Sequence, residues 1–109
     1  MHRKWRMRKN REFAWVFRKG KGVGGKYFTL VYLRARDQVH IGFSVSKKVG
    51  GAVVRNRVKR RLRECVRQEV ERVPVGYRLI FVPKPEAATA DFLQLRQAVR
   101  AQMQKAGAL

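Results

Sequence analysis

Few side chains in this 109-residue sequence have the types needed for acid–base or metal chemistry. It contains seven Asp and Glu residues, two histidines and one cysteine, and the acids are scattered along the chain. A metal-dependent nuclease needs several carboxylates that converge on ions about 4 Å apart. A metal-independent ribonuclease needs a positioned acid and base, typically His. The sequence therefore predicts no catalytic residue and no metal ligand.

Positive charge is the chemistry that the chain does offer. Its 27 Lys and Arg residues give a formal net charge of +20. Ten of them fall in residues 1–26 and nine in residues 47–67, and each of these segments contains a single Glu. Because uncompensated charge destabilises a compact state, we expect a polyanionic partner. Nucleic acid is the first candidate and an anionic membrane surface a more distant one.

The basic segment 47–67 also has a helical pattern. An apolar stripe of small side chains repeats at helical spacing, and cations cluster on the opposite side. Arg55, Lys59 and Arg63 follow one another four residues apart, which stacks like charges that a solvated helix would normally alternate with acids. Arg predominates, and its planar fork grips phosphate oxygens in pairs. A membrane-surface helix would present bulkier apolar residues. The pattern therefore favours nucleic acid over a membrane surface. The stripe consists of Val54, Val58, Leu62, Cys65 and Val66.

Helical and β patterns alternate along the chain and must position these cations. Their order is helix, two or three strands, helix, strand, helix, which predicts an α+β domain. We expect a small mixed sheet of about four strands with three helices (α-β-β-β-α-β-α). The two strands that flank the middle helix are candidates for parallel neighbours. Helices are expected over 10–19, 52–72 and from a capping box at Asp91 to Gly107, strands over 27–34, 39–46 and 77–82, and a glycine-rich loop over 20–25.

One domain accounts for the whole length, residues 1–109, with residues 1–9 as a flexible basic arm. The single cysteine excludes an internal disulfide and fits a reducing compartment. No apolar run is long enough to span a membrane, and no secretory signal pattern follows the basic N-terminus. The sequence thus predicts a cytoplasmic protein without a membrane partner.

The segment from Gly42 to Glu64, GFSVSKKVGGAVVRNRVKRRLRE, resembles the signature of the bacterial ribonuclease P protein component family. In that family an Arg-Asn-Arg helix follows a Ser-Lys-Lys-x-Gly loop. Residues 10–17, NREFAWVF, are similar to the family's first helix, and residues 81–85, FVPKP, to a later strand. The resemblance covers nearly the whole chain.

This resemblance implies a ribonuclease P protein-like fold, of the ribosomal S5 domain 2 type. It also implies an RNA-binding subunit of an endonuclease, a ribonucleoprotein hydrolase of bacterial tRNA processing. Ribonuclease P removes the 5′ leader from precursor tRNA. Its RNA subunit carries the catalytic site with Mg²⁺ held mainly by RNA. The implied partners are ribonuclease P RNA and precursor tRNA, with no small-molecule substrate.

Site residues follow from the charge pattern and the resemblance together. The residues expected to contact the catalytic RNA are Lys47, Lys48, Arg55, Asn56, Arg57, Lys59, Arg60, Arg61, Arg63 and Arg67. The basic N-terminal contacts are Arg3, Lys4, Arg6, Arg8, Lys9 and Arg11. The leader would lie between the first helix and the sheet, on Phe13, Phe17, Tyr32, His40, Ser44 and Ser46.

Several of these residues have a second interpretation. Two aromatics four residues apart, such as Phe13 and Phe17, are usually core, and spacing alone favours that. The resemblance implies a dual role, with the rings partly packed and partly exposed for base stacking. Tyr32 would face the other side of the sheet if its register is shifted by one residue. His40 is more simply an exposed or structurally bonded histidine. Trp15 has no assigned place.

Two other functions compete with this interpretation. One is an RNA-binding protein of another assembly, such as a small ribosomal protein. The other is a basic helix that reads the DNA major groove, although beyond Asn56 the helix offers few of the short polar residues that reach base edges. An aromatic cleft beside the sheet distinguishes ribonuclease P protein from both.

Overall fold

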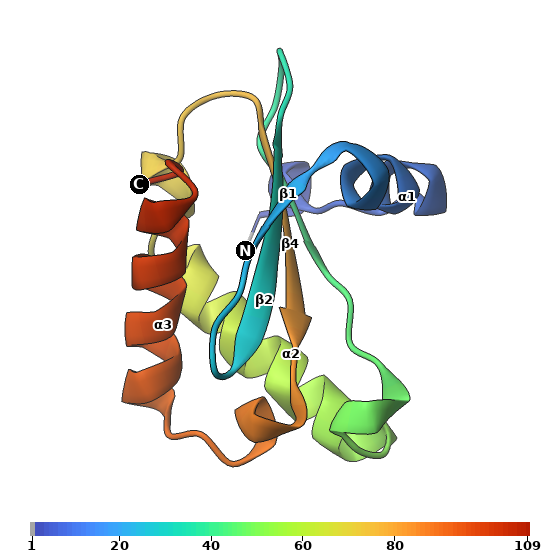
Figure 1. The fold of residues 1–109 in the computed structure, drawn as a ribbon, viewed down its shortest axis with the longest axis vertical. Helices are drawn as coiled ribbons and strands as arrows, with labels where there is room; N and C mark the ends of the chain where they lie inside the picture. Colours follow the sequence, from blue (N-terminus) through green and yellow to red (C-terminus); the bar gives the residue numbers. More distant parts are fainter. Residues whose placement is uncertain (1) are drawn as a thin grey trace.

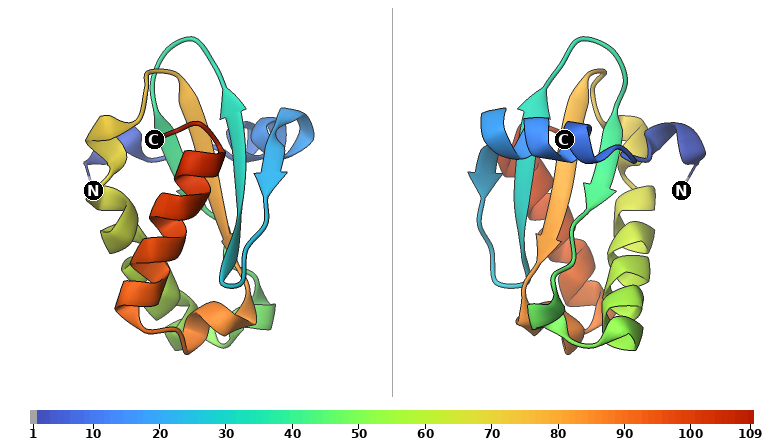
Figure 2. Two further views of the ribbon diagram at one scale, coloured as in Figure 1. Left: turned by 60° about the vertical axis from the view of Figure 1, so that its left-hand side comes forward. Right: turned by 90° about the vertical axis from the view of Figure 1, so that its right-hand side faces the viewer.

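The computed structural model describes residues 2–109, which form a mixed sheet with helices on both faces (Figures 1 and 2). The helices and strands are α1 (Asn10–Lys19), β1 (Lys21–Val23), β2 (Phe28–Arg34), β3 (His40–Phe43), α2 (Ala52–Arg67), β4 (Tyr77–Pro83) and α3 (Phe92–Lys105). Short 3-10 turns are η1 (Arg3–Trp5), η2 (Lys47–Val49), η3 (Val70–Arg72) and η4 (Pro85–Ala88). This confirms the predicted α+β class and element order.

The strand order in the sheet is β1-β2-β4-β3. β4 runs parallel to β3, as expected for two strands joined by a helix, and antiparallel to β2. β2 and β3 are therefore not neighbours, because β4 lies between them. The glycine-rich segment that we expected to be only a loop contains β1, in which Lys21 pairs with Tyr32 and Val23 with Leu30.

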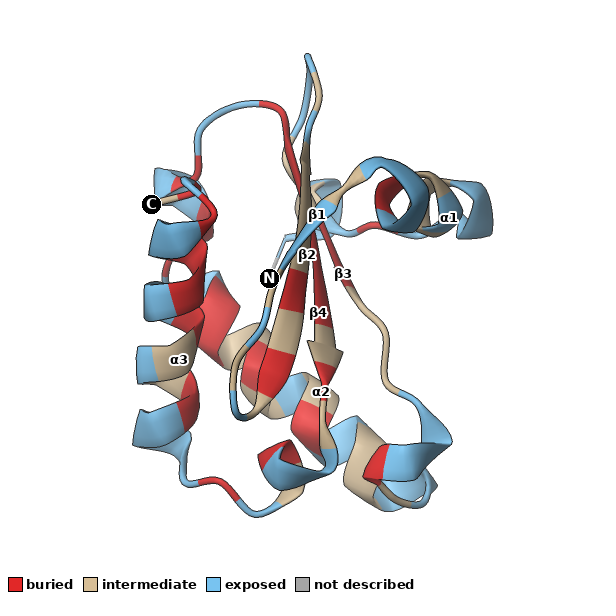
Figure 3. Cartoon of the chain, in the orientation of Figure 1, coloured by how far each residue is buried: buried red, intermediate tan, exposed pale blue. Residues whose placement is uncertain are grey.

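The hydrophobic core has two layers of unequal size, one on each face of the sheet. α2 and α3 cover one face, and α1 crosses the strands on the other (Figure 2). β4 alternates between the two layers: Leu79 and Phe81 belong to the main core, and Ile80 belongs to the smaller cluster with Met7 and Val16. All of these side chains are buried, so both helix layers are fixed to the sheet (Figure 3).

The ends of β3 and α2 differ most from the sequence-based prediction. β3 ends at Phe43 rather than Ser46, because the chain leaves the sheet after a last hydrogen bond from the Ser44 amide to the Phe81 carbonyl, 3.0 Å. α2 ends at Arg67 rather than Arg72 and continues as η3. α1 includes Asn10 as its first residue, with no side-chain cap hydrogen bond. The capping box of α3, between Asp91 and Gln94, is confirmed.

Residues 2–9 have a defined place on the edge of the sheet. The Met7 amide donates to the Ile41 carbonyl at 2.9 Å, and Arg6 forms a parallel bridge with Ile41. The Met7 side chain is buried under α1. The segment that we expected to be a flexible arm therefore lies along β3, because the otherwise unpaired edge of that strand offers it hydrogen bonds. Met1 lies outside the described residues.

Candidate nucleic-acid interface

The apolar stripe of α2 fixes which of its cations face outward. Val58, Leu62, Cys65 and Val66 are completely buried against the sheet and α3, as the helical pattern predicted. Burying a Val or Leu side chain contributes about 1.5–3 kcal/mol, so the rotation of the helix is firmly determined. Burial also raises the pKa of the Cys65 thiol to about 11, which keeps it protonated and unreactive.

The cations of α2 then separate into two flanks with different partners. On the flank that faces η4, Arg57 donates to the carbonyl of Ala88 at 3.1 Å and Arg61 to that of Ala90 at 2.7 Å. These guanidinium groups hold the connection between β4 and α3 against the middle helix. The structure therefore gives two of the predicted RNA contacts a packing role within the protein.

The packing role of Arg61 predicts a stability effect. Replacing Arg61 with Met removes a charged hydrogen bond to a backbone carbonyl, so we expect the free energy of unfolding to fall by about 1–2 kcal/mol. Urea denaturation measures this change. The matched control is Arg60→Met, one residue away and exposed, which should change stability by less than about 0.5 kcal/mol. Equal effects of the two substitutions would contradict the packing role.

The opposite flank of α2 faces β3 across a groove of about 570 Å³. Lys59 and Arg63 line it from the helix, and Arg6 and Arg8 from the arm. Its remaining lining residues are Met7, Phe13, Ile41, Gly42 and Phe43. Four cations thus line one groove next to the edge of the sheet. We name this the α2–β3 groove.

The cations on this flank of α2 are short of partners within residues 2–109. The Nε atoms of Arg55 and Arg63 are buried and have no hydrogen-bond partner within residues 2–109. The Arg63 guanidinium lies 5.9 Å from the centre of the Phe43 ring. Burial, with a smaller contribution from the charge of Arg6, lowers the pKa of Arg63. An anion against this flank would therefore reduce the repulsion between like charges and give these guanidinium groups an acceptor.

Two further hollows extend this surface along α2. One, of about 310 Å³, includes Arg55, Asn56 and Lys59, and the other, of about 400 Å³, includes Asn56, Arg60 and Arg63. Lys59 lines all three hollows. The flank is therefore one continuous basic surface rather than a set of separate sites.

α1 brings aromatic side chains close to the same edge of the sheet. Val16 is completely buried on the sheet, while Phe13 is partly buried and lines the α2–β3 groove. Phe17, one helical turn after Phe13, is 46% exposed. We expected each ring to be partly packed and partly exposed, but the two rings differ in exposure. Phe13 packs, and Phe17 presents its ring to solvent.

Gly42 allows the close approach of Phe13 to β3. A Cβ atom at this position would lie 2.5 Å from Cζ of the Phe13 ring, far inside van der Waals contact. The prediction from sequence did not single out Gly42. The available signal was an isolated glycine inside a strand pattern, which often marks a close approach.

Substituting Gly42 tests this contact. Gly42→Ala forces the Phe13 ring and α1 away from the sheet, so we expect a loss of about 1–3 kcal/mol in the free energy of unfolding. Gly22→Ala is the matched control, because the nearest atom to a Cβ there, in Thr29, is 3.8 Å away. Urea denaturation of both variants measures the difference. Indistinguishable midpoints would contradict the contact.

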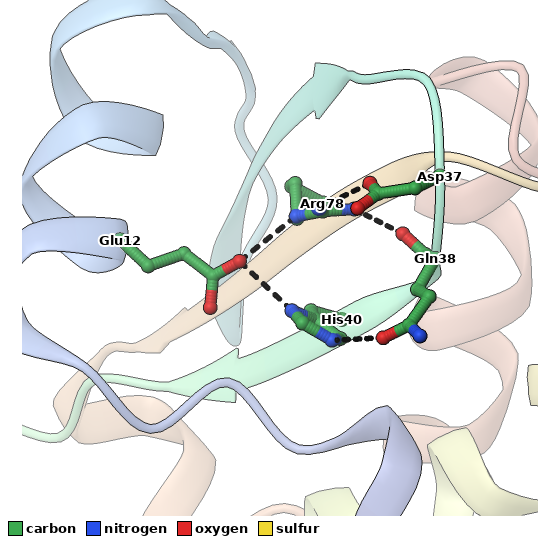
Figure 4. A network of polar contacts seen from close by, with 5 residues as sticks. All are labelled: Glu12, Asp37, Gln38, His40 and Arg78. Atoms are coloured by element: carbon green, nitrogen blue, oxygen red, sulfur yellow. Dashed lines mark hydrogen bonds and ion pairs between the residues drawn. The ribbon is translucent and has the colours of Figure 1, made fainter.

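A network of charges ties α1 to the sheet on the other side of Val16 (Figure 4). Arg78 of β4 is 5% exposed, and its Nε donates to Glu12 of α1 at 2.9 Å. The same guanidinium donates to Asp37 at 2.7 Å and to the Gln38 carbonyl. The hydrogen bond from Arg78 lowers the pKa of Asp37, which keeps that carboxylate charged. Helix, sheet and turn are thus joined through one buried cation.

Within residues 2–109, no three His, Cys, Asp or Glu side chains form a group that could hold a metal ion. Glu12 and Asp37, the two acids of the network, both pair with Arg78 instead. Among the described residues, these two acids are therefore engaged by a guanidinium rather than grouped as metal ligands. No helix in the same part of the chain has the length and apolar character needed to cross a membrane.

Comparison with known proteins identifies the family to which this chain belongs. The family model described as Ribonuclease P matches residues 1–107, nearly the entire chain. The chain belongs to the ribonuclease P protein component family. It is therefore a protein subunit of ribonuclease P, the endoribonuclease of tRNA 5′ processing, and its partner is ribonuclease P RNA. This excludes the ribosomal and DNA-reading alternatives.

Individual relatives agree with the family model. The ribonuclease P protein component of Brevibacillus brevis is 42% identical over 98 residues, which span 86% of this chain and 78% of the relative. That of Finegoldia magna is 38% identical, over 91% and 88% of the two chains. Among solved structures, the RNase P proteins of Staphylococcus aureus and Thermotoga maritima are each 27% identical. They have TM-scores of 0.86 and 0.81, over 95% and 92% of this chain and 96% of each of those chains.

The fold brings together only some of the residues expected to hold a leader. Tyr32 packs against the main core, on the opposite face of the sheet from Phe13, because β2 places it in phase with Phe28 and Leu30. His40 has both ring nitrogens engaged, Nδ1 with Glu12 at 2.8 Å and Nε2 with Gln38 at 3.1 Å. Tyr32 therefore lies away from Phe13, and His40 is bonded within the protein, which is the second interpretation given above for each residue.

The structure places the other predicted residues as follows. Ser44 and Ser46 follow β3, with Ser44 half-buried and Ser46 exposed. Lys47 and Lys48 lie in η2, immediately before α2, and are exposed. Arg67 pairs with Glu64, Nε to Oε2 at 3.1 Å, and is the only predicted α2 contact that forms an ion pair within residues 2–109. The predicted arm contacts Arg3, Lys4, Arg6, Arg8, Lys9 and Arg11 are all exposed.

Proposed function

We propose that this chain binds ribonuclease P RNA through the α2–β3 groove and its extension along α2, and holds the 5′ leader of precursor tRNA beside α1. The observation that carries the proposal is the meeting of unpartnered cations with partly exposed aromatics at one edge of the sheet. Lys59 and Arg63 share the groove with Phe13. Phosphate and base contacts to RNA require these two kinds of side chain.

RNA contact by α2 follows from the lack of protein partners on its β3-facing flank. Phosphate oxygens are the natural acceptors for cations that bind no carbonyl or carboxylate within residues 2–109. On this basis the main RNA contacts are Arg55, Asn56, Lys59, Arg60 and Arg63, joined by Lys47 and Lys48 before the helix. Arg57 and Arg61 contribute charge while they hold η4.

A leader beside α1 would use stacking rather than base-specific hydrogen bonds. Base stacking on an aromatic ring contributes about 1–3 kcal/mol per base and tolerates any sequence. Phe17 offers an exposed ring and Phe13 a partly exposed one. Leaders of different sequence can therefore be held by the same surface, with the arm cations beside it for their phosphates.

The division of labour with the RNA follows from what this chain does not offer. Cleavage and the Mg²⁺ ions belong to the RNA subunit, and the protein acts by position and charge. It neutralises repulsion between RNA segments and brings the leader next to the catalytic RNA. We place this reaction in the bacterial cytoplasm, where precursor tRNA is made.

Reconstitution tests this function. The protein is combined with a bacterial ribonuclease P RNA, and cleavage of precursor tRNA is followed at low Mg²⁺ with a long and a short leader. We expect the protein to raise the cleavage rate, and to raise it more for the long leader. A rate that the protein leaves unchanged for both substrates would overturn the proposal.

A further inference from the structure

A hollow separate from the three along α2 lies on the flank of α1 that faces away from Phe13 and Phe17. We name it the Trp15 hollow. At 100° per residue, Trp15 points to the side of the helix opposite both phenylalanines. The register of β3 and β4 agrees with this direction of Trp15. Phe13 lies over Gly42, whose partner in β4 is Ile80, whereas Trp15 lies near Arg78, whose partner in β3 is His40. Phe13 and Trp15 therefore lie over successive residue pairs of β3 and β4, on opposite sides of α1.

The Trp15 hollow has a volume of about 610 Å³, which is within the range of small-ligand sites. Six cations and two carboxylates line it together with Trp15 and His40. Arg78 engages both carboxylates, Glu12 and Asp37. The five remaining cations form no ion pair within residues 2–109. They are Arg6, Arg8, Lys9, Arg11 and Arg18.

The floor of the hollow is rigid and holds the aromatic ring in place. The Arg78 guanidinium is buried and is fixed by hydrogen bonds to Glu12, Asp37 and Gln38 (Figure 4). It lies 6.0 Å from the centre of the Trp15 ring. Trp15 itself is only partly buried. An indole that is supported from below and open to a basic hollow is suited to stack a nucleobase whose phosphates meet the surrounding cations.

We propose that this hollow binds an unpaired nucleotide of single-stranded RNA, with its base on Trp15 and its phosphates on Arg11 and Arg18. This site is separate from the leader surface of the proposed function. Arg6 and Arg8 line both the Trp15 hollow and the α2–β3 groove, so an RNA strand can pass from one to the other along the arm. Single-stranded RNA is the common chemistry of two sources, an unpaired segment of ribonuclease P RNA and the distal part of a long leader.

Fluorescence of Trp15 reports stacking at this site directly. The chain has two tryptophans, so the Trp5→Phe variant leaves Trp15 as its only one. We expect hexa-adenylate to quench this fluorescence saturably, and a 12-base-pair RNA duplex bound to the same extent not to quench it. Absence of quenching at saturating hexa-adenylate, or absence of hexa-adenylate binding, overturns the proposal.

Affinity for hexa-adenylate, measured by fluorescence anisotropy, tests the named residues. Trp15→Ala should weaken binding about tenfold, and Trp15→Phe should restore it to within about threefold, because a ring is again present. Arg11→Gln with Arg18→Gln should lower the salt slope by about two. The control pair is Lys21→Gln with Lys105→Gln, exposed and outside the hollow. An equal effect of both pairs contradicts the site.

Two further comparisons separate this site from the leader surface and identify its RNA. Quenching by hexa-adenylate should persist within about twofold in the Phe13→Ala, Phe17→Ala variant, and its loss there would mean a single shared site and overturn the proposal. Quenching by ribonuclease P RNA alone identifies the RNA subunit as the source. Quenching that appears only when long-leader precursor tRNA is added identifies the leader. Quenching by neither RNA overturns the proposal, while the leader effect on cleavage stands independently.

Discussion

Raising the salt concentration from about 50 to about 200 mM should weaken binding of this chain to ribonuclease P RNA by about a thousandfold. Each phosphate that a cation neutralises releases counterions, so the logarithm of the binding constant falls linearly with the logarithm of the salt concentration. About six neutralised phosphates give the stated change. The unpartnered cations of the α2–β3 groove and its extension supply most of them, together with the arm.

Filter binding over a salt series measures this slope. Lys59→Gln should lower it by about one, because Lys59 lines all three hollows of the basic surface. Lys105→Gln, at the end of α3, removes the same charge away from that surface and should leave the slope unchanged. A flat salt response of the unmodified protein would mean that the cations behind the net charge of +20 do not bind the RNA phosphates.

Removing the buried cation of the α1 network should cost about 3–5 kcal/mol of folding free energy. Arg78→Met leaves the Glu12 carboxylate, whose side chain is only 18% exposed, without the guanidinium that now lies 2.9 Å away. The hydrogen bonds to Asp37 and Gln38 are lost with it. The large effect therefore comes from the loss of the cation beside Glu12, which keeps only its hydrogen bond with His40, rather than from lost packing.

Urea denaturation of Arg78→Met, Glu12→Leu and the double variant forms a cycle that isolates this pair. If the penalty is the unpaired carboxylate, the double variant should lose clearly less than the two single losses together. Arg34→Met is the matched control, because Arg34 is an exposed arginine whose guanidinium lies over the Tyr77 ring. A loss below about 1 kcal/mol in Arg78→Met would contradict a structural role for the network.

Features that depend on local periodicity could be predicted from the sequence. The buried stripe of α2, with Val58 and Leu62, and the capping box of Asp91 both follow from residues a few positions apart. The parallel pairing of β3 with β4 also followed, since a helix joins them. These features are set by short-range spacing, which a single sequence displays.

Features that depend on contacts between distant segments could not be predicted in the same way. The place of Met7 on β3 depends on an unpaired strand edge that only the assembled sheet reveals. The face of Tyr32 depends on the register of β2. The split of the α2 cations depends on the carbonyls of Ala88 and Ala90, about thirty residues further along the chain. The charged residues could be counted from the sequence, but the groups that each of them binds could not be predicted from it.

The difference in affinity between precursor and mature tRNA tests the central claim most directly. The claim is that aromatics beside α1 hold the leader next to the basic surface that docks the RNA. The measurement compares the reconstituted complex with one that carries Phe13→Ala and Phe17→Ala, and with a control that carries Phe92→Ala, a similarly exposed ring on α3. We predict that the double variant binds precursor tRNA about tenfold more weakly while mature tRNA binding changes less than twofold, and that the control changes neither. An equal loss for precursor and mature tRNA would contradict the account.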